Sequence, residues 1–364
     1  MEKISSHQFM TLGAAVLMGT TFLPAASIVT GAGGRDGWIG VLPGFVIGVP
    51  YGLMILYLLT RHPQKNLIQI TESLLGKWVG KIAGVIYILI TAYFGGLLLG
   101  QCGDIFERSI MPLTPIALFY LGGLLIVLYL VWAGIEVFAR FSEVVFPLIV
   151  MGLILNVGLS FQRIEQGELL PILSKGLKPV MFSVLKTMPF AMEYILFIAG
   201  LLNFLPSGKQ EKGALKTGVW RAVFLVGTVN MFVVIIQILV FGPVETVRLV
   251  YGLLVLGKMI EISRTISGIE SLFMMIWFGA VVIKVTAFFY TTIWGLETVF
   301  NVKGKLCNLA VGLAFLGIAF GFVKGHSLIM EITLVDDYLI LPFASVWVLC
   351  LWLVSHWRKE IGVS

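Results

Sequence analysis

The sequence predicts an all-α integral membrane protein with about ten transmembrane helices. Of its 364 residues, 59% are hydrophobic and 12% are charged, whereas a soluble domain is about 45–50% apolar and about 25% charged. So few charges cannot cover the surface of a soluble protein of this length, but a lipid bilayer requires no charged exterior. Long apolar runs separated by short polar segments lead to the same conclusion, because a helix crosses the hydrocarbon with about 20 apolar residues.

Ten apolar runs are long enough to be membrane spans. They are residues 8–30, 38–59, 82–101, 115–133, 144–161, 184–205, 219–241, 271–295, 306–323 and 338–355. The first run resembles a secretory signal, but the membrane character of the remaining chain favours a retained helix. The polar stretches between the runs are too short for a soluble core. We therefore expect residues 1–364 to form a single polytopic membrane domain.

A further apolar segment, 247–260, is ambiguous because it is short and contains Arg248 and Lys258. With ten spans and the N-terminus inside, 14 of the 25 Lys and Arg residues fall on the inner side and 10 on the outer side. If 247–260 is counted as an eleventh span, the split becomes 12 against 11. The positive-inside rule favours the first arrangement. It places both termini in the cytoplasm and makes 247–260 a re-entrant or interfacial helix on the outer face.

Two spans contain residues that interrupt helices. Glycine lowers helix stability and proline removes a backbone donor. The expected break in the first span comprises Gly19, Thr20, Thr21 and Pro24, and that in the sixth comprises Met188, Pro189, Phe190 and Glu193. Because these spans lead the two halves of the chain, the pattern favours a five-plus-five inverted repeat with a solute site at the midplane. The alternative is that both prolines merely kink their helices, which membrane helices tolerate.

Two ionisable residues lie inside predicted spans. Lys284 falls near the middle of the eighth span and Glu193 lies in the sixth. A charge at the bilayer centre costs about 2.5–3.5 kcal/mol on the insertion scale, so each must face a partner or water. We expect Lys284 to donate to carbonyls freed between Gly19 and Pro24, as a built-in substitute for a coupling cation. Glu193 is a candidate proton carrier, ligand for a solute amine or structural acceptor, and Tyr93 is a weaker candidate that could equally be a packing residue.

The sequence offers nothing typical of an enzyme or a nucleic-acid-binding protein. No phosphate-binding glycine loop, nucleophile elbow or metal-binding histidine pair is present. The three cysteines lie far apart, and the net charge of +6 comes from basic residues in short clusters between apolar runs. We therefore expect no catalytic residues, no metal and no cofactor.

Several short motifs, in order along nearly the whole chain, resemble one family. They are the Gly19–Pro24 break, Gly-Arg-Asp-Gly-Trp at 34–38, Leu-Gly-Lys at 75–77, Leu-Leu-Pro-Ile-Leu at 169–173, Pro189–Glu193, and Glu-Ser-Leu-Phe at 270–273 with Trp277. The chain is similar to the B subunits of spore germinant receptors. These are endospore germination permeases of the amino acid–polyamine–organocation transporter superfamily.

The resemblance implies a transporter-like core in the spore inner membrane that binds a small nutrient, often an amino acid. It also implies two partners, a membrane-embedded A subunit and a lipoprotein C subunit. The leading hypothesis is therefore a nutrient receptor subunit that signals to its partners. The alternatives are a proton-coupled amino-acid permease acting through Glu193 or Lys284, and a largely structural subunit that anchors the complex.

Overall fold

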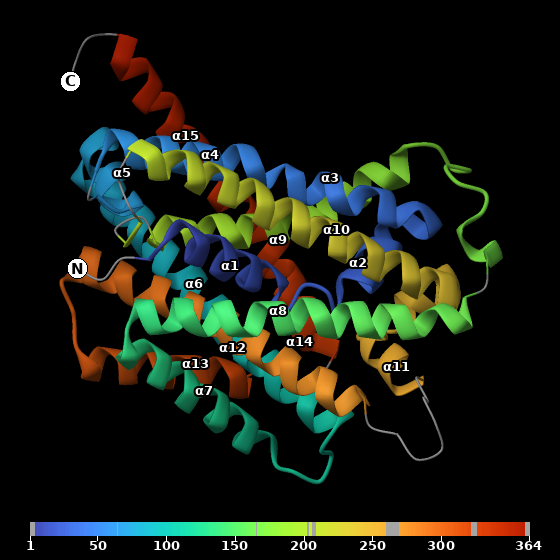
Figure 1. Ribbon diagram of the computed structural model, residues 1–364. Coiled ribbons are helices and arrows are strands. Elements are labelled where there is room, and N and C mark those ends of the chain that lie inside the picture. Colours follow the sequence, from blue (N-terminus) through green and yellow to red (C-terminus); the bar gives the residue numbers. More distant parts are fainter. Residues whose placement is uncertain are drawn as a thin grey trace.

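The fold is a bundle of long helices that lie mostly side by side. The computed structural model describes residues 4–63, 65–164, 166–201, 204–205, 209–259, 269–321 and 326–360. Within these ranges every regular element is a helix. Figure 1 shows most of them running lengthwise, with the N and C labels at the same end of the bundle.

The first half of the chain contains eight α-helices and three 3-10 turns. They are α1 (Ser6–Met18), α2 (Ala25–Gly33), η1 (Gly34–Gly40), α3 (Val41–Val46), α4 (Gly48–Arg61), α5 (Leu67–Leu75), α6 (Lys77–Ser109), α7 (Ile116–Ala133), α8 (Ile135–Ser160), η2 (Phe161–Arg163) and η3 (Gln166–Leu169). The second half comprises α9 (Lys178–Leu201), α10 (Lys209–Arg248), α11 (Gly252–Met259), α12 (Ile269–Phe300), α13 (Lys305–Gly321), α14 (His326–Val335), the π-helical turn η5 (Asp336–Ile340) and α15 (Leu341–Glu360).

Eight helical stretches in the described ranges are long and apolar enough to cross a membrane, and α13 is a shorter apolar helix. Each predicted span overlaps one or more of these helices or the α1–α2 pair. Residues 202–203 of the sixth predicted span, 322–323 of the ninth and 260 of the ambiguous segment lie outside the described residues. The ambiguous segment holds α11, whose eight residues span about 12 Å, far less than the roughly 30 Å of hydrocarbon. The ten-span topology stays a prediction.

The first span is interrupted at the predicted place. α1 ends at Met18 and α2 begins at Ala25, with a turn of six residues between them. The Thr21 hydroxyl donates to the carbonyl oxygen of Leu17 and the Ala25 amide donates to the carbonyl oxygen of Thr21. These bonds satisfy backbone groups that the interruption would leave without partners in a membrane interior.

The predicted break at Pro189 is wrong, because α9 continues as one helix from Lys178 to Leu201. Proline removes a single backbone donor, and in a membrane helix the neighbouring turns and Ser or Thr side chains can compensate. In the turns before Pro189, the hydroxyls of Ser183 and Thr187 donate to backbone carbonyl oxygens. α9 therefore presents Glu193 from a regular helix, and no run of freed carbonyls is available there for a solute amine.

A row of glycines lets the segment η1–α4 approach α9 closely. Gly40, Gly44 and Gly48 recur every four residues, and a Cβ atom added at each would lie within 3 Å of an atom of α9. A Cβ atom built on Gly44 would lie 2.5 Å from Cβ of Thr187, and one on Gly48 would lie 2.7 Å from Cβ of Ala191. Small residues at such spacing allow membrane helices to pack backbone to backbone. We call this contact the glycine seam.

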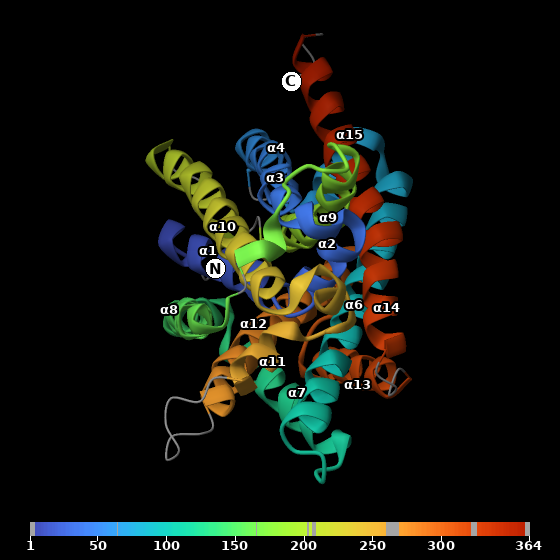
Figure 2. The ribbon, with the colours of Figure 1, turned by 90° about the vertical axis from the view of Figure 1, so that its right-hand side faces the viewer.

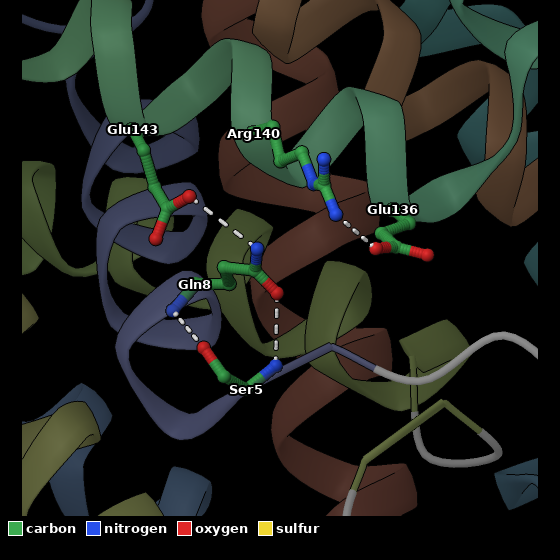
Figure 3. A network of polar contacts seen from close by, with 5 residues as sticks. All are labelled: Ser5, Gln8, Glu136, Arg140 and Glu143. Atoms are coloured by element: carbon green, nitrogen blue, oxygen red, sulfur yellow. Dashed lines mark hydrogen bonds and ion pairs between the residues drawn. The ribbon is translucent and has the colours of Figure 1, made fainter.

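The start of α1 is fixed to α8 by polar contacts, which Figure 3 shows from close by. Ser5 and Gln8 form a capping box, in which the Ser5 side chain accepts from the Gln8 amide and the Gln8 side chain accepts from the Ser5 amide. The Gln8 side-chain amide also donates to Glu143 of α8 at 3.3 Å. One turn away, Arg140 pairs with Glu136. The capping box satisfies amides that the first turn of a helix leaves free.

The bundle has buried central helices and an exposed apolar surface, as expected for a protein surrounded by lipid. α9 and α12 are buried along most of their length, whereas α7 exposes large apolar side chains. Leu125 and Tyr129 of α7 are 67% and 65% exposed. An exposed apolar surface of this kind is stable when hydrocarbon covers it. Figure 2 shows α7 at the periphery of the bundle.

Candidate functional site

The centre of the molecule contains a buried ion pair at the interruption of the first helix. Lys284 of α12 forms an ion pair with Glu193 of α9, and its Nζ atom donates to Thr20 Oγ1 at 2.7 Å. The residues Lys284, Glu193 and Thr20 are 0%, 2% and 5% exposed. The two intramembrane charges that the sequence singled out are therefore partners of one another, and a hydroxyl of the first-helix break completes the contact.

The approach of α12 to this break depends on Gly19. A Cβ atom on Gly19 would lie 2.7 Å from Cβ of Lys284 and 2.8 Å from the carbonyl oxygen of Ala280. Neither distance is compatible with a real side chain, and one of the two atoms belongs to backbone. The absence of a side chain at residue 19 thus lets the lysine stem pass directly beside the interrupted helix. The Phe94 ring of α6 lies 5.9 Å from Lys284 Nζ and offers the ammonium its electron-rich face.

Asp336 is a third ionisable group at this centre. It is 3% exposed, and its side chain interacts directly with that of Glu193. Asp336 opens the π-helical turn η5 between α14 and α15. Such turns replace the regular ladder over one turn and occur frequently at functional sites. Two buried carboxyl groups and one ammonium therefore lie in the interior of the bundle, and the ammonium pairs with Glu193. We call Glu193, Lys284 and Asp336 the charged triad.

A second ion pair lies next to the triad in the sequence. Asp337 pairs with Lys186 of α9, and the side chain of Lys186 is 41% exposed. This pair therefore lies partly at the surface of the bundle, whereas the triad is buried. Because Asp337 has its own cation, Lys284 is the cation that faces Glu193 and Asp336 within the described part of the chain.

The remaining predicted site residues divide between the break and more distant positions. Thr21 and Pro24 belong to the break, and the Thr21 hydroxyl is used within it. Phe190 of α9 stacks on Phe45, with 6.4 Å between ring centroids, and its part in ligand binding stays a prediction. Tyr93 donates to Glu331 of α14 at 2.8 Å. Tyr93 therefore contacts a carboxylate of α14, and its part in ligand binding stays a prediction, as does that of Met188 and Pro189.

Sequence reasoning missed Asp336. The last predicted span, 338–355, begins two residues after it. The preceding stretch Leu328–Val335 contains Glu331 and Thr333, so no local pattern marks Asp336 as buried.

Comparison with known proteins decides the family. A model of the family described as "Spore germination protein" matches residues 3–324. The chain belongs to the spore germination protein family. This confirms the resemblance to germination permeases that the motifs suggested. Three relatives from Bacillus subtilis (strain 168) are the spore germination proteins KB, YndE and A2.

Spore germination protein KB is 27% identical over 337 residues, covering 90% of this chain and 88% of the relative. Protein YndE is 26% identical over 330 residues, covering 89% and 88%. Protein A2 is 22% identical over 360 residues, covering 95% and 93%. The chain thus spans nearly the full length of each relative.

The fold is shared with a solved transporter. The crystal structure of MhsT in complex with L-phenylalanine matches with a TM-score of 0.72 and 14% sequence identity, covering 95% of this chain and 88% of MhsT. At this identity the likeness shows the fold alone. This spore germination protein is therefore an all-α membrane protein with a transporter fold, as the sequence predicted.

Proposed function

We propose that this protein is the nutrient-binding membrane subunit of a spore germinant receptor, with its ligand recognised at the charged triad and the first-helix break. The observation that carries the proposal is the contact of Lys284 with both Glu193 and Thr20. A broken helix exposes backbone amides and carbonyls that can bind the polar groups of a small solute. An amino acid carries a carboxylate and an ammonium, which are the two charge types that Lys284 and Glu193 bind.

Binding would act by shifting a conformational equilibrium. A ligand moves such an equilibrium only as far as its affinities for the two states differ. An amino acid that inserts between Lys284 and Glu193 would exchange their direct pairing for two contacts with itself. The helices α9 and α12 and the break would then separate slightly, and this rearrangement would pass to partner subunits.

The cellular setting belongs to the same proposal. The family is one of spore germination, and the apolar exterior requires a bilayer. We infer a location in the spore inner membrane with both termini on the core side, and an assembly with a membrane-embedded A subunit and a lipoprotein C subunit. Nothing in the described residues forms a metal-ligating cluster, and the proposal requires no cofactor.

The test is a thermal-stability screen of the purified protein against single amino acids, with and without partner subunits. A saturable rise in melting temperature is expected for at least one of them. Thr20→Val replaces one hydroxyl with a methyl group of similar size. It should raise the dissociation constant of that amino acid at least fivefold. The matched control is Thr217→Val, because Thr217 is an exposed residue of α10 whose hydroxyl bonds only to its own helix. If no amino acid stabilises any form, or if both variants respond alike, the proposed site is wrong.

A second function, proton-coupled transport, is favoured by the composition of the triad. Glu193, Asp336 and Lys284 together carry a net charge of −1 when all three are ionised. A single proton held between Glu193 and Asp336 removes that charge, since two carboxylates in contact rarely both ionise. Uptake of labelled amino acid into vesicles, driven by an imposed proton gradient and abolished in Asp336→Asn, would establish transport. Binding without uptake would assign the protein to sensing.

A further inference from the structure

A cavity whose lining contains no residue of the charged triad lies elsewhere in the bundle. Its volume is about 470 Å³, which is within the range of small-molecule pockets. It lies between the end of α2, the loop before α9 and the end of α10. The lining consists of Thr30, Gly31, Gly33, Gly34, Arg35, Asp36, Ser174, Lys175, Pro243, Val244 and Val247. It includes the first three residues of the Gly-Arg-Asp-Gly-Trp motif, which the triad does not use. We call it the outer cavity.

The wall formed by α2 offers polar groups with little steric cover. Gly31, Gly33 and Gly34 carry no side chain, and Gly34 has a φ of 60°, a conformation that favours glycine. Thr30 is 1% exposed, and its hydroxyl has no hydrogen-bond partner in the structure. A buried hydroxyl without a partner is rare, because its desolvation costs about 1–3 kcal/mol. A ligand in the cavity would supply that partner.

The charged side chains of the cavity that have no ion-pair partner among the described residues are both positive. Arg35 and Lys175 form no ion pair with any described residue. Asp36 is 4% exposed and is already engaged, since its Oδ1 atom accepts from the Leu173 amide at 3.0 Å. Glu168 lies against Gly242 and is not part of the lining. Asp36 thus anchors the loop that carries Lys175, while the two cations are available to an anion.

We propose that the outer cavity binds the carboxylate group of a small solute, with Arg35 and Lys175 as its cationic partners and Thr30 as a hydrogen-bond donor. A guanidinium binds a carboxylate through two parallel hydrogen bonds, which gives both strength and orientation. This site is distinct from the charged triad. It would hold a solute at the surface of the bundle whether or not the triad is competent to bind.

The proposal can be tested by the rate at which phenylglyoxal modifies individual arginines of the purified full chain in detergent, followed by mass spectrometry. Sodium acetate at increasing concentration should slow modification of Arg35 at least threefold. Methylammonium chloride should have no effect. Arg140, which is exposed and paired with Glu136, is the internal control and should react at a constant rate. Failure of acetate to protect Arg35, or equal protection by methylammonium, would overturn the proposal.

Variants separate this site from the triad. Lys175→Gln and Thr30→Val should each raise the acetate concentration for half-protection of Arg35 severalfold. Glu193→Gln and Asp336→Asn should leave it unchanged, so this site can stand even if the proposed function of the triad fails. Phosphatidylglycerol added to the micelles provides the remaining comparison. If that lipid protects Arg35 and acetate does not, the cavity binds a lipid headgroup and the proposal of a solute site is wrong.

Discussion

Lys284 is a fully buried ammonium, so its contacts decide whether the surrounding structure is stable. Desolvating two ions is costly, and a buried pair offsets that cost only when both partners are present. Removal of one partner leaves an uncompensated charge and typically destabilises a protein by about 3–5 kcal/mol. A single substitution that removes the charge of Lys284 or of Glu193 should therefore lower the free energy of unfolding strongly.

We predict that Lys284→Met lowers the free energy of unfolding by about 3–5 kcal/mol, because it retains apolar length and deletes the charge. The measurement is denaturant or thermal unfolding in detergent. The control is Lys303→Met, since Lys303 pairs with Glu297 at 2.9 Å while 64% exposed, and such pairs contribute about 0–1 kcal/mol.

The double variant Lys284→Met/Glu193→Gln sharpens this prediction. It removes both charges, so we expect it to be more stable than Lys284→Met alone. A double variant that is less stable than Lys284→Met would show that the lysine acts through packing and not through its charge.

At the residue level the sequence predicted part of the charged triad. The free-energy cost of a mid-span lysine required a partner, and the structure places Lys284 Nζ 2.7 Å from Thr20 of the predicted break. The identity of the acidic partner did not follow, because the distance between α9 and α12 is a tertiary property. Asp336 was not predicted either, since the π-helical turn that carries it into the interior has no local sequence signature.

At the level of elements, the two prolines that the sequence predicts to interrupt helices, Pro24 and Pro189, have different effects. Pro24 follows a glycine and two threonines, and the chain there leaves the helical path. Pro189 lies between good helix neighbours, and α9 passes through it. Proline removes the same donor in both places, so its presence alone does not determine whether a helix breaks. Gly19 lowers helix stability before Pro24, whereas no glycine lies within ten residues of Pro189.

The glycine seam supports a prediction about helix packing. Gly44→Ala should destabilise the protein by about 1–3 kcal/mol, because the added methyl group would overlap Thr187. The control is Gly122→Ala in α7, where no atom lies within 4 Å of the added Cβ and alanine favours the helix by up to about 1 kcal/mol. Thermal unfolding of the two variants provides the comparison. Equal melting temperatures would contradict close packing at the seam.

At the scale of the whole molecule, the N and C labels of Figure 1 lie at the same end of the bundle. The Ile4 amide donates to the carbonyl oxygen of Phe204 at 3.2 Å, so the start of α1 lies beside the segment that follows α9. This arrangement agrees with the excess of basic residues that the sequence places on the inner side.

The topology prediction can be checked with reporter fusions. A reporter after Val302 should be cytoplasmic, and one after Ser174 should be external. An external reading at Val302 would contradict ten spans with an internal N-terminus.

The composition sufficed to predict the class of fold and nearly all helices, because membrane burial acts on whole segments. The outer cavity could not be predicted, since it forms where segments distant in the sequence meet.

The hydrogen bond from the Leu173 amide to Asp36 and the glycine seam together restrict how η1–α4 and α9 can move relative to one another. Asp36 lies at the start of η1–α4, and Leu173 lies in the loop that leads into α9. The two segments are thus latched at one end and interlocked backbone to backbone along their length, so they resist sliding past one another. The same pair carries Arg35 at one end and Glu193 farther along. A displacement of the loop that carries Leu173 would therefore move η1–α4 and α9 together, and Glu193 with them.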